Sequence, residues 1–335
     1  MENRKSITIL DVAKLARVST ATVSRCLNNS ENVKNVTKQR VISAVESLGY
    51  YPNFGAKVLA AKKTNLIGAI IPTMENAIFA AGIQAFQEVL SVAGYTLLVS
   101  SSSYQRDLEE EQIYALVSRG ADALLLIGED RDPNIYEYLK QRQIPYVIAW
   151  NYRNGLQHTF IGFDNMRAAQ MATEEVIKRH HKHICIIAGN TAENDRARDR
   201  RIGFIRSLEH HKIAISANQI IEASYVFEEA GDAFDTLICN NPETTAILCG
   251  NDVLAVGALL RARKRGFNIP KQISIVGFDD IEISNIVSPK LSTVHVPHRQ
   301  MGRHSAQSII NMLNGSPEMK SLELKPYFVQ RESLS

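Results

Sequence analysis

The chain has 335 residues, of which 38 are Lys or Arg and 35 are Asp or Glu, giving a formal net charge of +3. This length is too great for one ordinary domain and suits a small domain joined to a large one. The polar N-terminus lacks the apolar core of a signal peptide, and no apolar run approaches membrane-spanning length. The four cysteines have no metal-binding spacing, which predicts buried, reduced thiols in a cytoplasmic protein: Cys26, Cys185, Cys239 and Cys249.

The charge is unevenly distributed along the chain. Residues 1–63 contain eleven Lys or Arg and four Asp or Glu, a net charge of +7, which leaves −4 for the remainder. A basic head on a mildly acidic body predicts a polyanionic partner for the head alone. A solvated basic face without a partner is the alternative interpretation.

Residues 8–28 have the pattern of two short amphipathic helices joined by a tight turn. Thr8 is placed to cap the first helix, with Asp11 three residues on, and Ser19 to cap the second. The apolar positions are Leu10, Val12, Ala13, Ala16, Val18, Val23 and Leu27. The outward face of the second helix carries short or forked side chains that suit a major groove: Thr20, Ala21, Thr22 and Arg25. The pattern predicts a helix-turn-helix, with an ordinary helical hairpin as the alternative.

A third helix is predicted from Thr37, as its cap, to about Leu48. Its inward side chains are Val41, Ile42 and Val45, and basic side chains that can meet phosphate lie near its start: Lys34, Lys38 and Arg40. The next segment, residues 54–63, has weak helical character and contains Gly55. So short a helix is mostly unfolded by itself in water, so a flexible linker is one interpretation of this segment.

From Asn65 onward, apolar runs alternate with amphipathic helical segments. The runs are Leu66–Ile71, Tyr95–Ser100, Ala123–Ile127, Tyr146–Ala149, Ile184–Ala188, Ala246–Leu248 and Ile273–Val276. The helical segments include Ala80–Ala93, Leu108–Arg119, Asn165–Arg179, Arg200–His210, Phe227–Asn240 and Leu254–Arg265. This alternation predicts a doubly wound, parallel α/β architecture, and the number of units favours two lobes with a cleft between them.

The first sixty residues resemble the DNA-binding head of the lactose-repressor (LacI/GalR) family. The matching residues are Asp11-Val12-Ala13, Val18-Ser19, Ala21-Thr22-Val23-Ser24-Arg25, Leu27-Asn28, Val41, Leu48-Gly49-Tyr50, Pro52-Asn53, Ala56 and Leu59. The family usually has Gly in the turn, where this chain has Arg17. If that position needs a positive φ, Arg costs about 1 kcal/mol more than Gly, and a phosphate contact by Arg17 is the other interpretation.

The resemblance implies which residues of the head contact DNA: Thr8, Ser19, Thr20, Ala21, Thr22, Arg25, Asn28 and Thr37. It also implies that residues 53–64 form a hinge helix when two copies meet over the minor groove. Leu59 matches a side chain that wedges between base pairs there, and Lys57 and Ala60 match neighbouring contacts.

The rest of the chain resembles the periplasmic-binding-protein-like effector core of the same family. This implies a head over residues 1–52, the hinge over 53–64, and an effector-binding and dimerisation core over 65–335. The expected N-lobe covers about 65–161 and 294–325, and the expected C-lobe about 162–290 and 326–335. The chain is expected to cross between lobes near Ile161, Pro289–Val294 and Lys325.

The same resemblance implies a set of effector-binding residues: Asn76, Ile78, Phe79, Trp150, Arg196, Arg200, Tyr225, Asn251, Asp252 and Asp279. Five of these residues have a plainer alternative. Arg196 and Arg200 can belong to a surface ion-pair cluster, Phe79 and Trp150 to the core, and Asp252 to a helix cap. Polar groups mixed with aromatic faces suit a sugar or sugar acid. The tract at residues 180–183, which contains three His, is interpreted as a solvated turn rather than a metal site.

Together these features predict a cytoplasmic, homodimeric, ligand-responsive repressor of carbohydrate or related metabolite genes that binds a near-palindromic operator. No nucleotide-binding loop or nucleophile elbow occurs, so we expect no enzymatic activity, cofactor or metal, and no membrane partner. The sequence shows no added heptad segment near its last residues, so nothing in it supports the expectation of a tetramer. The alternatives are a periplasmic sugar-binding protein, an α/β enzyme and a nonspecific DNA-binding protein.

Overall fold

The computed structural model describes residues 7–27, 33–51, 63–154, 158–316 and 321–335. The chain divides into two compact units, residues 1–64 and residues 65–335. The described part of the smaller unit contains three helices, α1 (Ile9–Ala16), α2 (Thr20–Leu27) and α3 (Asn35–Leu48). They enclose a small core in which Val12, Val23 and Val41 are fully buried. The first helix presents Leu10 to solvent, contrary to expectation, and packs Ile9 against this core instead.

The ends of the head helices follow their capping chemistry. The Asp11 carboxylate accepts hydrogen bonds from the Thr8 N–H and hydroxyl at 2.9 and 2.7 Å, and the Thr22 N–H donates to the Ser19 hydroxyl at 3.2 Å. Arg17 ends α1 with φ 53° and ψ 50°, so the turn requires a left-handed residue and Arg carries the expected strain. The expected cap of the third helix is wrong, because α3 begins at Asn35 and Thr37 lies in its first turn.

The described part of the larger unit contains two parallel sheets. The strands of the first sheet are β1 (Leu66–Ile71), β2 (Thr96–Ser101), β3 (Ala123–Ile127), β4 (Tyr146–Ala149), β5 (Phe160–Gly162) and β11 (Leu322–Glu323). They pair in the order β11-β5-β4-β3-β1-β2 and form the N-lobe sheet. The strands of the second sheet are β6 (Ile184–Gly189), β7 (Ile220–Ala223), β8 (Ala246–Cys249) and β9 (Ser274–Val276). They pair in the order β7-β6-β8-β9 and form the C-lobe sheet.

Helices cover both faces of each sheet, as expected for a doubly wound fold. The N-lobe helices are α5 (Ala77–Val92), α6 (Arg106–Ser118), α7 (Pro133–Gln141) and α13 (His298–Leu313). The C-lobe helices are α8 (Asn165–Ile177), α9 (Asp195–His210), α10 (Phe227–Asn240), α11 (Asp252–Lys264) and the short α12 (Ile283–Ile286), with a 3-10 turn at Ala217–Gln219. Two strands between the lobes, β10 (Thr293–His295) and β12 (Tyr327–Val329), pair antiparallel.

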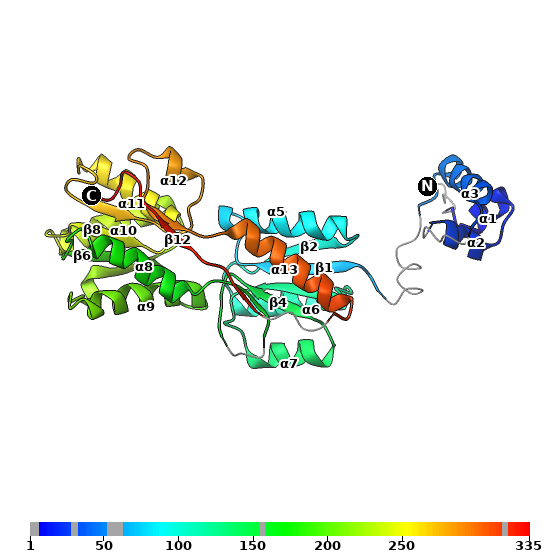
Figure 1. Cartoon of the computed structure of the whole chain (residues 1–335), viewed down its shortest axis with the longest axis horizontal. Helices are drawn as coiled ribbons and strands as arrows, with labels where there is room; N and C mark the ends of the chain where they lie inside the picture. The colour runs from blue at the N-terminus through cyan, green and yellow to red at the C-terminus, as the bar shows by residue number, and fades with distance from the viewer. Residues whose placement is uncertain (1–6, 28–32, 52–62, 155–157, 317–320) are drawn as a thin grey trace, which may run out of the picture. The chain divides into compact units, whose positions relative to one another are not determined.

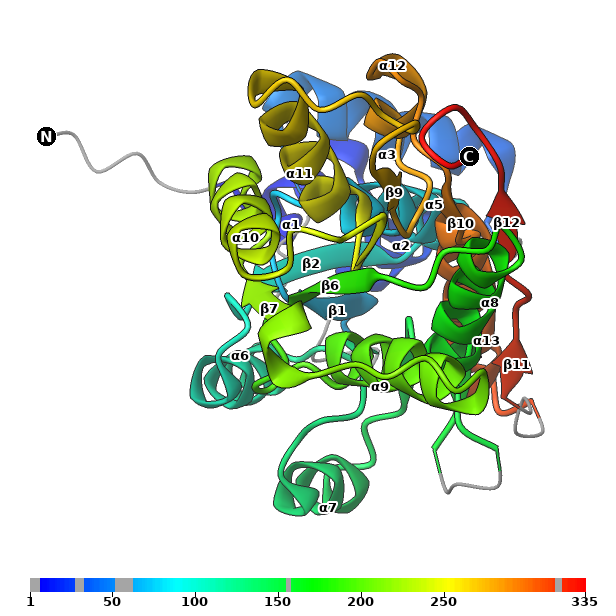
Figure 2. The ribbon, with the colours of Figure 1, turned by 90° about the vertical axis from the view of Figure 1, so that its left-hand side faces the viewer.

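Alternation along each central strand explains why both faces are covered. Successive strand side chains point to opposite faces, so Ile67 and Ile71 pack toward α5 and α13 while Ile70 packs toward α6 and α7. In the C-lobe, Ile186 packs toward α8 and α9 and Ile187 toward α10 and α11. Figure 1 shows α5 and α13 side by side on the N-lobe, and Figure 2 shows α10 and α11 on the opposite side of β6 from α9. The two-lobed α/β core predicted from the sequence is confirmed.

Helices α5 and α13 cross at two glycines. A methyl group at Gly302 would overlap the backbone carbonyl of Gly82, which cannot move without displacing α5. Gly302→Ala is therefore expected to lower the free energy of unfolding by about 1–3 kcal/mol, measured by urea denaturation. Gly231→Ala on α10 is the matched control, because its new methyl group meets only the flexible side chain of Arg261. Equal stability of the two variants would show that the close crossing is not required.

Candidate ligand-binding cleft

A cavity lies between the lobes, where the carboxyl ends of the parallel strands of both sheets meet. Nine of the ten side chains expected to bind an effector line it: Asn76, Ile78, Phe79, Trp150, Arg196, Arg200, Tyr225, Asn251 and Asp279. Four further lining residues were not predicted: Tyr104, Phe163, Asn165 and Asn194. We refer to this space as the effector cavity. Its free volume is about 10 Å³, which is room for about one water molecule.

Three helices begin at the effector cavity, and an asparagine caps each of them. The Asn76 side chain accepts a hydrogen bond from the Ile78 N–H at 3.2 Å, Asn194 from Ala197 at 3.3 Å, and Asn251 from Leu254 at 2.9 Å. The positive ends of α5, α9 and α11 therefore converge on the same space, which favours electronegative ligand atoms. Asn194 could have been predicted from the sequence, because Asn is a common N-cap residue and it directly precedes α9.

Asp252 is the one expected effector-binding residue that does not line the cavity. Its side chain is fully buried, and its carboxylate accepts hydrogen bonds from the Thr293 hydroxyl at 2.5 Å and the Ile281 N–H at 2.8 Å. Burial raises the pKa of this carboxyl group well above its usual value. Asp252 therefore connects α11 to the segments that carry Ile281 and Thr293, and in this structure it does not line the effector cavity. The cap of α11 is Asn251, not Asp252.

Arg200 is the best-placed cation in the effector cavity. It is 6% exposed, lies over the Phe278 ring with 4.8 Å from Cζ to the ring centroid, and approaches the Asp279 carboxylate at 3.5 Å. Its Nε donates to the Arg196 carbonyl at 3.3 Å, while Nη1, the nitrogen of the ion pair with Asp279, makes no hydrogen bond within the described part of the chain. A buried guanidinium nitrogen held only by this long ion pair would be stabilised by a ligand acceptor at hydrogen-bond distance.

Arg196, unlike Arg200, makes a hydrogen bond to the opposite lobe. Its Nη1 contacts the Asp195 carboxylate at 2.7 Å and donates to the Ile127 carbonyl of the N-lobe at 3.2 Å. This nitrogen is already used in holding the lobes together. Arg196 therefore lines the effector cavity without the unpaired donor that distinguishes Arg200.

Asp279 faces Arg200 from a strained backbone with φ 109°. Burial raises the pKa of this carboxyl group to about 7, and the nearby guanidinium of Arg200 offsets only part of that effect. At neutral pH the group exchanges between acid and carboxylate. It can therefore accept from a ligand hydroxyl or donate to a ligand oxygen.

The raised pKa of Asp279 predicts a pH-dependent stability. The folded protein binds this proton more tightly than the unfolded chain, whose carboxyl group has a pKa of 3.8. The stabilisation is full below that value and is lost as the pH rises to about 7. Relative to Asp279→Asn, which cannot titrate, the wild-type protein should lose up to about 1.4 kcal/mol of unfolding free energy per pH unit across this range. Parallel pH profiles from urea denaturation of the two proteins would contradict this assignment.

The aromatic wall of the effector cavity is part of the core as well. The Trp150 Nε1–H donates to His298 Nδ1 at 3.0 Å, and the Phe79 ring centroid lies 5.7 Å from that of Trp150. Burial lowers the pKa of His298 to about 3, so its imidazole is neutral and can accept this hydrogen bond. Phe79 and Trp150 are therefore core residues and also line the effector cavity.

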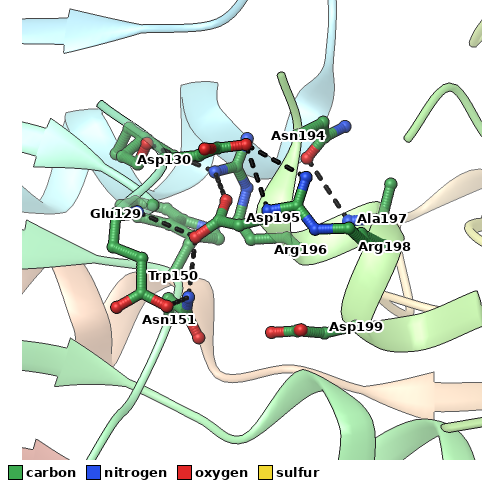
Figure 3. A network of polar contacts seen from close by, with 12 residues as sticks. Glu129, Asp130, Trp150, Asn151, Asn194, Asp195, Arg196, Ala197, Arg198 and Asp199 are labelled. Carbon is green, nitrogen blue, oxygen red and sulfur yellow. Dashed lines mark hydrogen bonds and ion pairs between the residues drawn. The ribbon is translucent and has the colours of Figure 1, made fainter. Parts of the chain in front are cut away.

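A polar network joins the lobes beside the effector cavity, and Figure 3 shows the part of it around Asp195. The buried carboxylate of Asp195 accepts from the Glu129 N–H at 2.8 Å and from Asn151 Nδ2 at 2.7 Å, both in the N-lobe. Ion pairs from Arg198 to Asp130 at 3.0 Å and from Arg153 to Asp199 at 2.6 Å lie around it. The hydrogen bonds of Asp195 and the charge of Arg196 hold the pKa of the Asp195 carboxyl group below its usual value despite burial. We refer to these contacts as the interlobe network.

The predicted DNA-reading residues of the head lie on its surface or in its caps. Ser19, Ala21 and Arg25 are exposed on and next to α2, Thr20 and Thr22 are partly exposed, and Thr8 is exposed at the start of α1. Thr37 is partly exposed in the first turn of α3. Four further residues expected to contact DNA lie outside the residues that the structure describes: Asn28, Lys57, Leu59 and Ala60.

Among the described residues, no group of three or more His, Cys, Asp or Glu side chains has the arrangement of a metal site, and no helix has the length and hydropathy to cross a bilayer. Cys26, Cys185 and Cys249 are buried as expected, whereas Cys239 is exposed, contrary to expectation. Within the histidine tract, His181 contacts the Thr245 hydroxyl through Nδ1 at 3.0 Å and the Ser335 carbonyl through Nε2 at 3.3 Å.

Comparison with known proteins identifies the family. Residues 8–53 match the bacterial regulatory proteins of the lacI family, and residues 64–332 match the periplasmic binding proteins and sugar binding domain of the LacI family. The chain belongs to the LacI family. The resemblance seen in the sequence is thereby confirmed, as is the prediction of a ligand-responsive, DNA-binding transcriptional regulator.

LacI-family relatives align over nearly the full chain. Catabolite control protein A of Priestia megaterium is 29% identical over 97% of this chain and 98% of its own length. The transcriptional repressor PurR of Aliivibrio fischeri is 31% identical over 98% of both chains. A LacI-family regulator structure from Silicibacter pomeroyi has a TM-score of 0.89 at 25% identity, covering 98% of this chain and 99% of that one. The Lac repressor dimer bound to operator and the anti-inducer ONPF also has a TM-score of 0.89, with 24% identity and coverage of 99% and 100%, and it supports the fold.

Proposed function

We propose that this LacI-family regulator is a homodimeric repressor whose effector is a sugar or sugar acid bound in the effector cavity. The observation that carries the proposal is the pairing of Arg200 and Asp279 beside Asn251 in a cavity with aromatic walls. Arg200 supplies donors, Asp279 supplies an acceptor or a donor, and the amide of Asn251 faces the same space. Phe79 and Trp150 supply ring faces, so the lining suits a hydroxylated ring with hydrogen-bonding groups on its edge, and the lobes must part to make room for it.

In this proposal each head places α2 in one major-groove half-site of a near-palindromic operator. Thr20, Ala21 and Arg25 lie closest to base edges, and Arg25 is the direct contact, with guanine as its preferred base. Thr8, Ser19, Thr22, Asn28 and Thr37 contact the DNA backbone or complete the caps that position α2. Residues 53–64 form the hinge, with Leu59 as the minor-groove wedge and Lys57 and Ala60 beside it.

Effector binding would act through the angle between the lobes. A ligand that favours one lobe arrangement biases whether the two hinges of the dimer can pair on DNA. The proposed binding site suits either kind of effector, one that releases the protein from DNA or one that promotes DNA binding. The proposed setting is the cytoplasm, with operator DNA, a second copy of the chain and the effector as partners, and with neither a cofactor nor an enzymatic reaction.

Arg25→Ala tests base reading by the head. The variant should lose operator affinity by about 1–3 kcal/mol while its affinity for random DNA falls much less. Fluorescence anisotropy with both DNAs at one salt concentration measures the ratio, after an operator has been selected from a random pool. Arg40→Ala is the matched control, because this exposed α3 side chain is placed for phosphate and should weaken both complexes equally. Equal losses on both DNAs for Arg25→Ala would contradict base readout.

The effector class is tested by thermal-shift screening. A ligand that binds the folded state alone raises the melting temperature by mass action. Sugars and sugar acids should include at least one compound that does so for the wild-type protein. A screen in which only apolar or nucleobase compounds raise the melting temperature would contradict the proposed class while leaving the DNA-binding function intact.

A further inference from the structure

Two consecutive aspartates shortly after β9 have backbones with positive φ. Asp279 has φ 109° and Asp280 has φ 58°. Asp tolerates the left-handed region in which Asp280 lies, but φ 109° lies outside it and is strained for a residue with a Cβ atom. Such a backbone persists only where the surrounding structure holds it. Asp279 faces Arg200, so the contacts that hold this turn also determine where the effector cavity presents its carboxyl group.

The side chains of the two aspartates have different surroundings. Asp279 lines the effector cavity and Asp280 does not. The Asp280 carboxylate accepts a hydrogen bond from Arg331 Nη2 at 2.5 Å and lies 2.8 Å from His295 Nδ1. The Ser284 hydroxyl of α12 also donates to it, at 3.2 Å. Asp280 is therefore held by α12, by β10 and by the segment that follows β12.

The two basic partners of Asp280 belong to the strands between the lobes. His295 ends β10, and its ring stacks on Tyr327 of β12 with the ring centroids 4.7 Å apart. Arg331 follows β12, and its Nη1 donates to the Leu291 carbonyl ahead of β10 at 2.8 Å. One carboxylate thus ties the turn to both strands on which the chain passes between the lobes.

The backbone of Asp279 is joined to the first of these strands as well. Its N–H donates to the Val294 carbonyl at 2.8 Å, and its carbonyl accepts from the Val296 N–H at 3.4 Å. The second of these hydrogen bonds is long and weak. Without the Asp280 side chain, the strained residue would depend on these two backbone contacts with β10.

The adjacent carboxyl groups have opposite pKa shifts. Burial raises the pKa of Asp279 to about 7. Burial would also raise the pKa of Asp280, but the hydrogen bonds from Arg331 and His295 hold this pKa below its usual value. Asp280 is therefore an anion at neutral pH, which suits an anchor between two basic side chains. Asp279 can gain or lose its proton, which suits a ligand contact.

We propose that Asp280 is a positioning residue for the effector cavity, and that its contacts with β10 and the segment after β12 hold Asp279 toward Arg200. A binding group keeps its geometry when the residues behind it are themselves fixed by hydrogen bonds. A ligand that displaces Asp279 therefore acts on the two strands at which the lobes change their angle. The inference rests on the proposed function only for ligand contact by Asp279.

A double-mutant cycle measured by urea denaturation tests this role without an effector or an operator. The unfolding free energy of the wild-type protein should fall relative to that of Asp279→Asn between about pH 5 and pH 7, because only the wild-type protein carries the titrating carboxyl group. In the Asp280→Ala background the same fall should be less than half as large. The released Asp279 becomes hydrated there, and its pKa drops toward 3.8.

A merely structural role for Asp280 predicts a different result. Asp280→Ala would then lower the stability of both partners in the cycle equally and leave the pH-dependent difference between them unchanged. The other charged or titratable groups around Asp279 occur in all four proteins: Tyr104, Arg200, Asp252 and His298. An unchanged difference in the Asp280→Ala background would overturn the proposal.

Asp235→Ala is the matched control background. Asp235 on α10 also pairs with two basic side chains, Arg261 and Arg265, but it does not line the effector cavity. The full pH-dependent difference should persist there. If Asp280→Ala does not fold, His295→Ala removes one of the two basic partners and must reduce the difference, and an unchanged value overturns the proposal equally. Failure of ligand or operator binding would count against the proposed function and leave this result standing.

Discussion

Arg200→Ala is expected to abolish the effector response while leaving the operator affinity of the unliganded protein nearly unchanged. The guanidinium supplies a buried nitrogen with no hydrogen-bond partner in the described residues and the positive charge beside Asp279. Each charge-assisted hydrogen bond to a ligand contributes about 1.5–3 kcal/mol, so its removal weakens ligand binding roughly 10- to 100-fold. Isothermal titration with the ligand identified by thermal shift measures the loss, and anisotropy measures the operator affinity.

Arg201→Ala is the matched control for Arg200→Ala. The Arg201 side chain is adjacent in the chain and carries the same charge, but it is partly exposed and pairs with Glu222 at 2.9 Å outside the effector cavity. This variant should respond to ligand as the wild-type protein does. If Arg200→Ala also responds at the wild-type ligand concentration, Arg200 does not contact the effector.

Asp195→Ala should produce the largest loss of stability among the interlobe variants. This 2% exposed carboxylate accepts from the Glu129 N–H and the Asn151 amide and pairs with Arg196 at 2.7 Å. Removing one partner of a buried charged group leaves the others unpaired, which costs about 3–5 kcal/mol. Urea denaturation should show this loss. Small-angle scattering should show a larger radius of gyration, because the lobes are joined less tightly.

The control for Asp195→Ala is Asp232→Ala. Asp232 also pairs with an arginine, Arg261, at 2.8 Å, but the Asp232 side chain is 67% exposed. Exposed ion pairs contribute about 0–1 kcal/mol, so this variant should be nearly as stable as the wild-type protein. Equal midpoints for the Asp195 and Asp232 variants would mean that the interlobe network does not hold the lobes together.

The bounds of helices and strands were predicted most accurately where an element has a continuous apolar run or a clear helical pattern of apolar residues. The ranges predicted for β1, β3, β4 and α10 match the structure residue for residue, because continuous apolar runs and clear helical periodicity mark them. Helix α13 was not predicted. Its buried face interrupts apolar residues such as Met301 and Ile309 with Gly302, Ser305 and Ser308, which carry no hydrophobic signal.

Helix α9 shows a second limit of sequence reasoning. Its predicted start was Arg200, but the helix begins at Asp195 after the Asn194 cap. The charged run in its first turns resembles a solvated loop in the sequence. In the structure Asp195, Arg196 and Asp199 are buried and contact the N-lobe, which no local pattern can indicate.

For the candidate site too, residues marked by a local sequence pattern were predicted, and residues placed by tertiary contacts were missed. Residues at strand ends and helix starts, such as Asn76 and Asn251, were predicted because the fold class places them at the cleft. Tyr104 was missed because its turn reaches the cavity only through the tertiary arrangement of the two lobes. Of the neighbouring residues Asn251 and Asp252, only Asn251 lines the cavity, because successive residues at a helix start point in different directions.

The most direct test of the account is the operator affinity of the wild-type dimer with and without saturating ligand, at one salt concentration. Coupling between the effector cavity and the head predicts a change of roughly 5-fold or more in either direction, and the same ligand concentration should leave the affinity of Arg200→Ala unchanged. An identical operator affinity with the ligand demonstrably bound in the cleft would contradict the account.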